Sequence, residues 1–411
     1  MNPLSFRARR LPFRFTLCLL AAAALGACGG GTSGEADADA ATAAMASADG
    51  GFELQSVADV TALDTSEHST DVAAAAAEPT PPTAVDGVSA SVPVPPGTPV
   101  ATPPAPQAPG AGSLAVTINS AAIPASTTGY GGDRVKTTGK MPSTTSIGAF
   151  RVLCNFSHMA NDDPIVYPGQ PGRSHLHTFF GNAGTNAYST AESIATTGNS
   201  TCNGGTVNRT GYWVPTLVDT RTNTPLKPKS AIVYYKTGYN GIKPEAVRPF
   251  PAHLRMIAGD AKNTTAKGPF TWKCVHKSEE LHGAGIQNCP AGGELWQVVF
   301  FPQCWDGVNL DSPDHKSHMS YTVNKACPKT HPVPLPEITF NITYVVPETD
   351  APTHWRLSSD AYDRSLPAGY SSHGDWFNGW KKDVMETWVK NCDQASKDCL
   401  AYLLGDGREI Y

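Results

Sequence analysis

The sequence predicts a mainly β fold, a sandwich or jelly-roll-like domain with long loops, disulfides and one amphipathic helix near the C-terminus. Runs of β-branched and aromatic residues recur through the second part of the chain, and Gly and Pro interrupt nearly every segment between them. Helical spacing of apolar residues is convincing at one place only. No repeat with a period of roughly 20–50 residues is present, so a solenoid or a propeller is not expected.

Four segments carry the strand signal. The segment 338–346 alternates polar and apolar residues, as expected for a strand with one buried face. The other three are nearly continuous β-branched and aromatic runs, at 114–118, 231–236 and 295–301.

The predicted helix runs from about Gly374 to Lys390. Asp375 then lies where the helix begins, and a carboxylate at that position is a good N-cap. Large apolar residues recur every four positions along it, at Trp376, Trp380, Val384 and Trp388.

The N-terminus has the pattern of an export signal. Several arginines precede a short apolar run, which is too short to span a bilayer permanently. Leu25-Gly26-Ala27-Cys28 then resembles the lipobox of bacterial lipoproteins. The resemblance implies that residues 1–27 are removed and that Cys28 becomes the lipidated first residue of an envelope protein. Gly29 after it favours the outer membrane or cell surface, and a plain secreted protein cut near Ala27 is the alternative.

Residues 28–113 are predicted to be a disordered tether. They are rich in Ala, Ser, Thr and Pro and hold eleven acidic residues with no Lys or Arg. Such a segment buries too little apolar surface to fold. The rest, 114–411, is one large domain or two tightly joined halves, and it carries 27 Lys and Arg against 25 Asp and Glu. A near-neutral domain has no basic surface for nucleic acid.

Eight of the ten cysteines lie in 114–411. Because the chain is exported, the even number predicts four disulfides. Neighbours in sequence are the simplest pairs, Cys274 with Cys289 and Cys304 with Cys327. Thiolate metal ligation has less support, since no Cys-x-x-Cys motif is present.

Three polar stretches are candidates for a functional site. The first, 304–321, combines three aspartates, two histidines, a lysine and a tryptophan beside a predicted disulfide. Paired carboxylates serve as acid and base in glycosidic hydrolysis. They also bind calcium, but no EF-hand spacing is present. A solvated Asp-rich loop is the structural alternative.

The second stretch holds His175 and His177. On a strand, residues i and i+2 share a face, so this pair suits a metal ion or catalysis. Hydrogen bonding in a polar groove explains it equally well. The third stretch is His373-Gly374-Asp375-Trp376, in which Asp375 either caps the helix or orients His373 as a base. Nucleophile, P-loop and His-Glu-x-x-His motifs are absent from the sequence.

These stretches together resemble a known family. Over roughly Phe150 to Cys392 the sequence is similar to the secreted domain family DUF1996 of fungi and bacteria. The resemblance implies an exported domain and carries no established reaction. Cys399 lies outside the common cysteine set, so its pairing with Cys392 is not implied. The motifs that carry the resemblance are Asp163-Pro164-Ile165-Val166, Ser174-His175-Leu176-His177, Phe301-Pro302-Gln303-Cys304-Trp305-Asp306-Gly307, Asp314-His315-Lys316-Ser317-His318 and His373-Gly374-Asp375-Trp376.

The leading hypothesis is an envelope-anchored domain that binds a polysaccharide and, if it is an enzyme, hydrolyses it. The membrane is then a partner through the lipid on Cys28. The expected catalytic residues are Asp311, Asp314, His373 and Asp375. The expected substrate-binding residues are Asp163, His177, Trp305, Asp306, Lys316 and Trp376.

Two alternatives stay open. In the first, the domain is a metal-binding module in which imidazoles hold copper or zinc, which both suit neutral histidine. Its expected ligands are His175, His177, His315 and His318. In the second, the protein is a non-catalytic envelope or adhesion protein whose histidines form only a hydrogen-bonded network.

Overall fold

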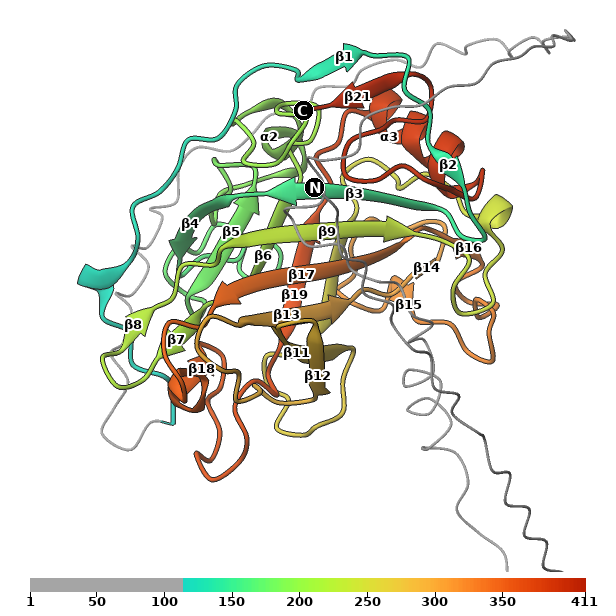
Figure 1. The fold of residues 1–411 in the computed structure, drawn as a ribbon. Coiled ribbons are helices and arrows are strands. Elements are labelled where there is room, and N and C mark those ends of the chain that lie inside the picture. Colours follow the sequence, from blue (N-terminus) through green and yellow to red (C-terminus); the bar gives the residue numbers. More distant parts are fainter. Residues whose placement is uncertain (1–113) are drawn as a thin grey trace, which may run out of the picture.

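The computed structural model describes residues 114–411. The predicted signal peptide and tether, with Cys28, lie outside the described residues. Two large sheets dominate the described part, and the strands of one run across those of the other (Figure 1). This crossing resembles orthogonal sheet packing. The predicted mainly β fold is confirmed.

The larger sheet has eight strands, all antiparallel except for one residue pair between β20 and β3. Their order is β12 (Glu279–Gly283), β11 (Phe270–His276), β13 (Glu294–Phe300), β17 (Glu337–Val345), β9 (Ser230–Lys236), β3 (Ala149–Cys154), β20 (Lys397–Asp398) and β2 (Ser143–Thr144).

The second sheet has five antiparallel strands and carries the site described below. Their order is β10 (Arg255–Gly259), β19 (His373–Phe377), β6 (Gly211–Pro215), β5 (His177–Gly181) and β4 (Phe156–Ala160).

Short elements complete the fold. The small sheets are β15 (Met319–Ser320), β14 (Cys304–Trp305) and β16 (Val333–Pro334); β18 (Trp355–Leu357), β7 (Leu217–Asp219) and β8 (Thr224–Pro225); and β1 (Val135–Thr137) with β21 (Arg408–Ile410). The helices are α2 (Ala191–Thr196) and α3 (Lys382–Trp388), the π-helical turn η5 (Val389–Asp393), and the 3₁₀ turns η2 (Ser120–Ala122), η3 (Pro244–Ala246) and η4 (Ala351–His354).

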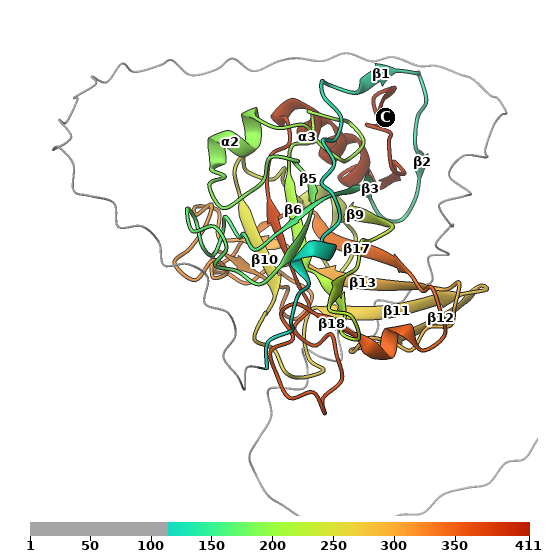
Figure 2. The same ribbon diagram turned by 90° about the vertical axis from the view of Figure 1, so that its left-hand side faces the viewer.

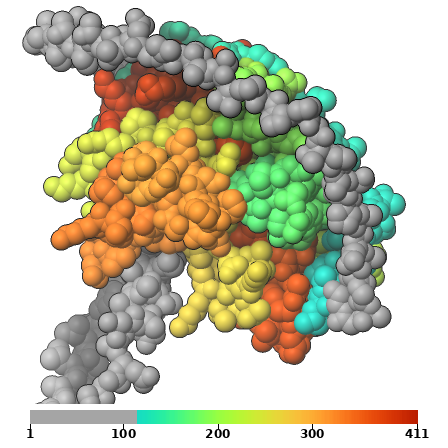
Figure 3. Space-filling view, turned by 180° about the vertical axis from the view of Figure 1, so that it is seen from behind, coloured from blue at the N-terminus to red at the C-terminus, as the bar shows by residue number. Residues whose placement is uncertain are grey.

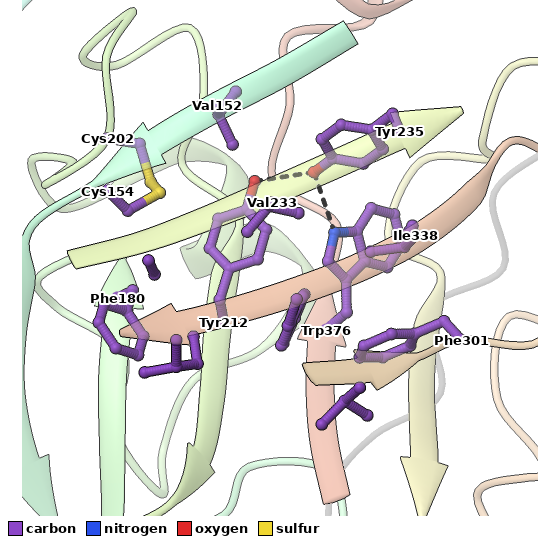
Figure 4. Packing of buried hydrophobic residues seen from close by; sticks show 14 of the residues in the cluster. Val152, Cys154, Phe180, Cys202, Tyr212, Val233, Tyr235, Phe301, Ile338 and Trp376 are labelled. Atoms are coloured by element: carbon purple, nitrogen blue, oxygen red, sulfur yellow. Dashed lines mark hydrogen bonds between the residues drawn. A yellow bond between two sulfur atoms is a disulfide. The ribbon is translucent and has the colours of Figure 1, made fainter. Parts of the chain in front are cut away.

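The main core lies between the two large sheets. Tyr212 and Trp376 reach from the five-stranded sheet toward Tyr235 of β9 (Figure 4). The Tyr235 hydroxyl lies 2.9 Å from that of Tyr212 and accepts a 3.3 Å bond from the indole of Trp376. Buried Tyr and Trp need such partners for their polar ends. The core therefore joins the sheets by polar bonds as well as apolar contact.

Three of the four predicted strands are confirmed to within one residue, as β9, β13 and β17. The strand at 114–118 is wrong, because none of these residues belongs to a strand. Ile118 instead packs, half-buried, against the small cluster of Phe156, Met159 and Leu176. Its apolar composition therefore serves packing rather than strand pairing.

The C-terminal helix is confirmed only in its second half. Residues His373–Phe377 form β19, in the interior of a sheet between β10 and β6, and α3 begins at Lys382. Gly374 lets this strand pack closely on the core, since a Cβ there would lie 3.1 Å from the ring of Phe340. Asp375 is therefore not a helix cap, and Lys381 precedes α3 without a side-chain cap.

All eight cysteines of the described region are paired. The bonds are Cys154–Cys202, Cys274–Cys289, Cys304–Cys327 and Cys392–Cys399. Both pairs predicted from sequence proximity are confirmed. Four disulfides indicate an extracytoplasmic protein. Among residues 114–411, no helix has the length and hydrophobicity to cross a membrane.

Candidate metal centre

The outer face of the five-stranded sheet carries three histidines. His177 is the first residue of β5 and His373 the first of β19. Because side chains alternate along a strand, His373 and Asp375 share the outer face, whereas Trp376 points into the main core. Helix α2 lies over this sheet, away from the eight-stranded one (Figure 2). The outer face is closed by a second apolar cluster of Ile165, Phe179, Ile194, Trp213 and Phe377.

The rings of His175, His177 and His373 converge at one point. The Nε2 atom of His373 lies 3.2 Å from Nε2 of His175 and 3.4 Å from Nε2 of His177. One nitrogen from each ring lies within 4.8 Å of the other two, a spacing at which the three rings are able to hold a metal ion. His175 and His177 were predicted as a pair, and the structure adds His373 to them.

Backbone carbonyls fix the orientation of two of these rings. His177 Nδ1 lies 2.9 Å from the carbonyl of Asp162, and His373 Nδ1 lies 2.8 Å from that of Ser371. A carbonyl only accepts, so each Nδ1 carries the proton and donates it. In the neutral rings, both Nε2 atoms then present lone pairs to the same point. This backbone bond is the usual way in which proteins orient metal-binding histidines.

Two carboxylates, of Asp162 and Asp360, hold the two carbonyls in place. Asp162 accepts the backbone N–H groups of Gly172 and Ala187, each at 3.1 Å. Asp360 is fully buried and accepts both the Gly369 N–H at 2.8 Å and the Ser371 hydroxyl at 2.6 Å. These supporting residues were missed from the sequence, because nothing local marks a carboxylate that acts through a backbone carbonyl.

The environment keeps all three rings neutral. Burial is the main cause, and it lowers the pKa of His177 and of His373 to about 4. Burial also lowers the pKa of His175 well below its usual value, and the neighbouring rings of His177 and His373 lower it further. Neutral imidazole is the form that binds metal ions.

Two carboxyl groups and one ammonium surround the triad. Asp163 accepts the backbone N–H groups of Ile165 and Val166, both at 2.9 Å. Asp375 is buried, and its Oδ2 has no hydrogen-bond partner within residues 114–411. Burial, together with the charge of Asp163, raises the pKa of Asp375 well above its usual value. The charge of Lys316 acts on both His373 and Asp375.

His315 and His318 lie outside the triad, so the structure does not bring the four predicted histidines together. His318 uses both ring nitrogens locally, with Nε2 donating to the carbonyl of Arg255 at 2.7 Å and Nδ1 lying 2.9 Å from the hydroxyl of Ser312. His315 Nδ1 lies 3.0 Å from the carboxylate of Asp311. The two rings therefore stabilise the 304–321 loop, and His373 takes their place in the triad.

The aspartates of that loop are engaged in shaping it. Asp311 forms an ion pair with Arg255 at 2.8 Å. Asp306 accepts the backbone N–H groups of Val308 and Asn309, and Asp314 accepts those of Lys316 and Ser317. The backbone N–H of Ser317 is the main cause that lowers the pKa of Asp314. A carboxyl group with a low pKa is a poor general acid.

The two tryptophans expected to stack on sugars differ in exposure. Trp376 is fully buried in the core, so its ring presents no surface on which a sugar could stack. Trp305 is partly exposed, and its indole N–H donates to the carbonyl of Asn309 at 2.7 Å. Among the residues predicted to bind substrate, His177, Asp163 and Lys316 lie at the triad or next to it.

Of the comparisons with known proteins, only the one with protein families gives a match. No curated protein and no solved structure matches the chain. Residues 163–380, more than half of the 411, match the model of the family described as a domain of unknown function, DUF1996. This span includes all three histidines of the triad. The chain therefore belongs to the DUF1996 family.

Proposed function

We propose that the protein binds a transition-metal ion, copper or zinc, through His175, His177 and His373. The supporting observation is the convergence of three ring nitrogens within 4.8 Å of one another. In His177 and His373, the backbone bonds already leave Nε2 free to coordinate. Without a cation, two lone pairs would face each other at 3.4 Å with no proton between them.

The ligand set suits a functional centre better than a structural one. Three imidazoles are suitable for copper and for zinc. Structural zinc sites close their coordination with four protein ligands, whereas catalytic sites use three and leave a position open. A metal ion there would act as a Lewis acid or would lower the pKa of a bound water molecule.

The metal content of the purified protein tests this proposal. We expect protein made in an oxidising compartment and dialysed without chelator to retain one copper or zinc ion per chain. His177→Ala and His373→Ala should lose that ion, measured by elemental mass spectrometry. His282→Ala is the matched control, since His282 lies on β12 of the other sheet and is outside the triad.

Unfolding must be excluded as the cause of metal loss. Near-ultraviolet circular dichroism of each variant in its metal-free form shows whether the core is intact. Wild-type protein that takes up no metal even when copper or zinc is supplied would refute the proposal. So would a folded His373→Ala variant that retains the full amount.

Envelope anchoring and glycan binding are further proposals. Lipid anchoring through Cys28 is supported by the sequence pattern alone. Polysaccharide binding is supported by the partly exposed ring of Trp305. Hydrolysis by Asp311 and Asp314 has less support, since both carboxylates are already bound by neighbouring groups. Turnover of a panel of polysaccharides by wild type and by Asp314→Ala tests it.

A further inference from the structure

A cavity of about 270 Å³ is lined in part by Gly259, the register partner of His373 in the neighbouring strand. It is lined by the end of β10, the loop that follows β10 and the 304–321 loop. Its walls include Gly259, Phe270, Lys316 and Met319. Figure 3 shows this side of the molecule, where segments coloured green, yellow and orange, near residues 180, 270 and 315, come together. The volume suits a small molecule, or one end of a larger one.

Lys316 connects the cavity to the triad. Its ammonium group donates a 2.9 Å bond to the carbonyl of Gly259, and Gly259 is the register partner of His373. A Cβ at Gly259, whose φ is +83°, would lie 2.9 Å from Cα of His373, so only glycine allows this approach. Lys316 is therefore held at the boundary between the cavity and the three rings.

No acidic side chain of the described region neutralises Lys316. It is exposed and forms no ion pair among residues 114–411. A second lysine, Lys267, lines the same cavity and is also without an ion pair in that range. The lining holds one carboxylate, Asp260, which accepts the backbone N–H of Lys262 at 2.9 Å. The cavity therefore has an excess of positive charge.

The triad would add to this charge when it holds a metal ion. Three neutral imidazoles leave the charge of a divalent cation uncompensated. Asp163, one of the nearby carboxyl groups, already accepts two backbone N–H groups. Uncompensated charge at a site withdrawn from water is costly, and an anion removes that cost.

We propose that the centre binds an anionic ligand, a carboxylate or another small oxyanion, between the metal position and Lys316. The ligand enters through the cavity, where Phe270 and Met319 provide apolar walls for the rest of the molecule. This inference rests on the proposed function, because the anion completes the coordination of the metal ion. It names the class of substrate or ligand that the centre selects.

Azide binding to the copper(II)-loaded protein tests the inference. Azide is an anion whose coordination to copper(II) produces a charge-transfer band, so its dissociation constant is read directly from a titration. We expect azide to bind wild-type protein and acetate to compete with it. In Lys316→Gln the dissociation constant should rise about tenfold, as expected for loss of one nearby charge in a partly solvated site.

Matched variants separate this effect from a general change of charge. Lys267→Gln should raise the constant less than Lys316→Gln does. Lys382→Gln on α3, whose partner is Glu386 at 3.3 Å, should leave it unchanged. The copper content of every sample is measured alongside.

The outcomes distinguish the two proposals. If wild-type protein takes up neither copper nor zinc, the proposed function fails and the anion site fails with it. If copper is held but azide leaves its spectrum unchanged, only the anion site is refuted. Equal azide affinities for wild type and a copper-loaded Lys316→Gln would refute the role of Lys316 in the same way.

Discussion

The carboxyl group of Asp393 lies in the core. The residue is fully buried, and neither side-chain oxygen has a hydrogen-bond partner in the described part of the chain. Burial raises its pKa well above the usual value, because the charged form loses its hydration. The folded protein therefore holds this proton more tightly than the unfolded chain does. Its contribution to stability falls as the pH rises from about 4 toward the raised pKa.

Asp393→Asn should for this reason stabilise the protein at neutral pH. We expect the free energy of unfolding to increase by roughly 1–2 kcal/mol at pH 7 and to change little at pH 4. Urea unfolding curves at several pH values measure both effects. Asp383→Asn, at an exposed position in α3, is the control and should show no such pH dependence. A parallel pH dependence of wild type and Asp393→Asn would contradict the assignment.

At the residue scale, the sequence singled out the three histidines of the site but did not show that they lie together in the fold. His175 and His177 are a visible pair, and His373 stands out beside Asp375. That His373 completes the pair depends on the register of β5, β6 and β19, which brings together residues 196 and 198 positions apart. His315 and His318 looked equally suitable, but bonds to Asp311 and to the carbonyl of Arg255 engage them locally.

At the scale of elements, the tryptophans also show where prediction from the sequence fails. Trp376, Trp380 and Trp388 all reach Tyr235, two by hydrogen bonds of 3.3 and 3.2 Å and one by ring contact at 4.8 Å. They do so from a strand, the segment after it and a helix. The regular spacing of these tryptophans therefore does not reflect one continuous helix. It reflects their common contact with Tyr235 in the core. The β-branched runs were predictable because strand propensity and burial agree there.

Removal of two different disulfides, Cys304–Cys327 and Cys392–Cys399, should affect azide binding differently. Cys304–Cys327 closes the segment that carries Lys316, over a separation of 23 residues. Replacing both cysteines by serine should cost roughly 3 kcal/mol of stability, from the entropy of the opened loop. It should also weaken azide binding to the copper-loaded protein, because Lys316 would lose its fixed position. Unfolding curves and azide titrations measure these effects.

The bond Cys392–Cys399 provides the comparison for this experiment. It spans seven residues and joins η5 to the segment after β20, beside the eight-stranded sheet. Its removal should cost roughly 2 kcal/mol, and it should leave azide binding unchanged. If both pairs of serine variants weakened azide binding equally, the role of the 304–327 loop would lose its support.

At the scale of the whole molecule, the two large sheets depend on each other. The chain builds β3 in one sheet, passes to β4, β5 and β6 in the other, and returns for β9. It crosses again for β10 and for β19. Neither sheet is a continuous piece of sequence, so neither is able to form its full set of strands alone. The triad, with histidines from before β5 and from β5 and β19, forms only when both sheets are in place.

This interleaving predicts that residues 114–411 unfold as one cooperative unit. The disulfide-bonded fragment Leu114–Tyr411 should show a single transition, with a midpoint within about 2 °C of that of the chain beginning at Cys28. Tryptophan fluorescence reports the main core and metal release reports the triad, so both should follow the same curve. Release of the metal well below the core transition would show that the five-stranded sheet opens independently. A fragment that melts clearly earlier would assign residues 28–113 a part in stability, against their prediction as a tether.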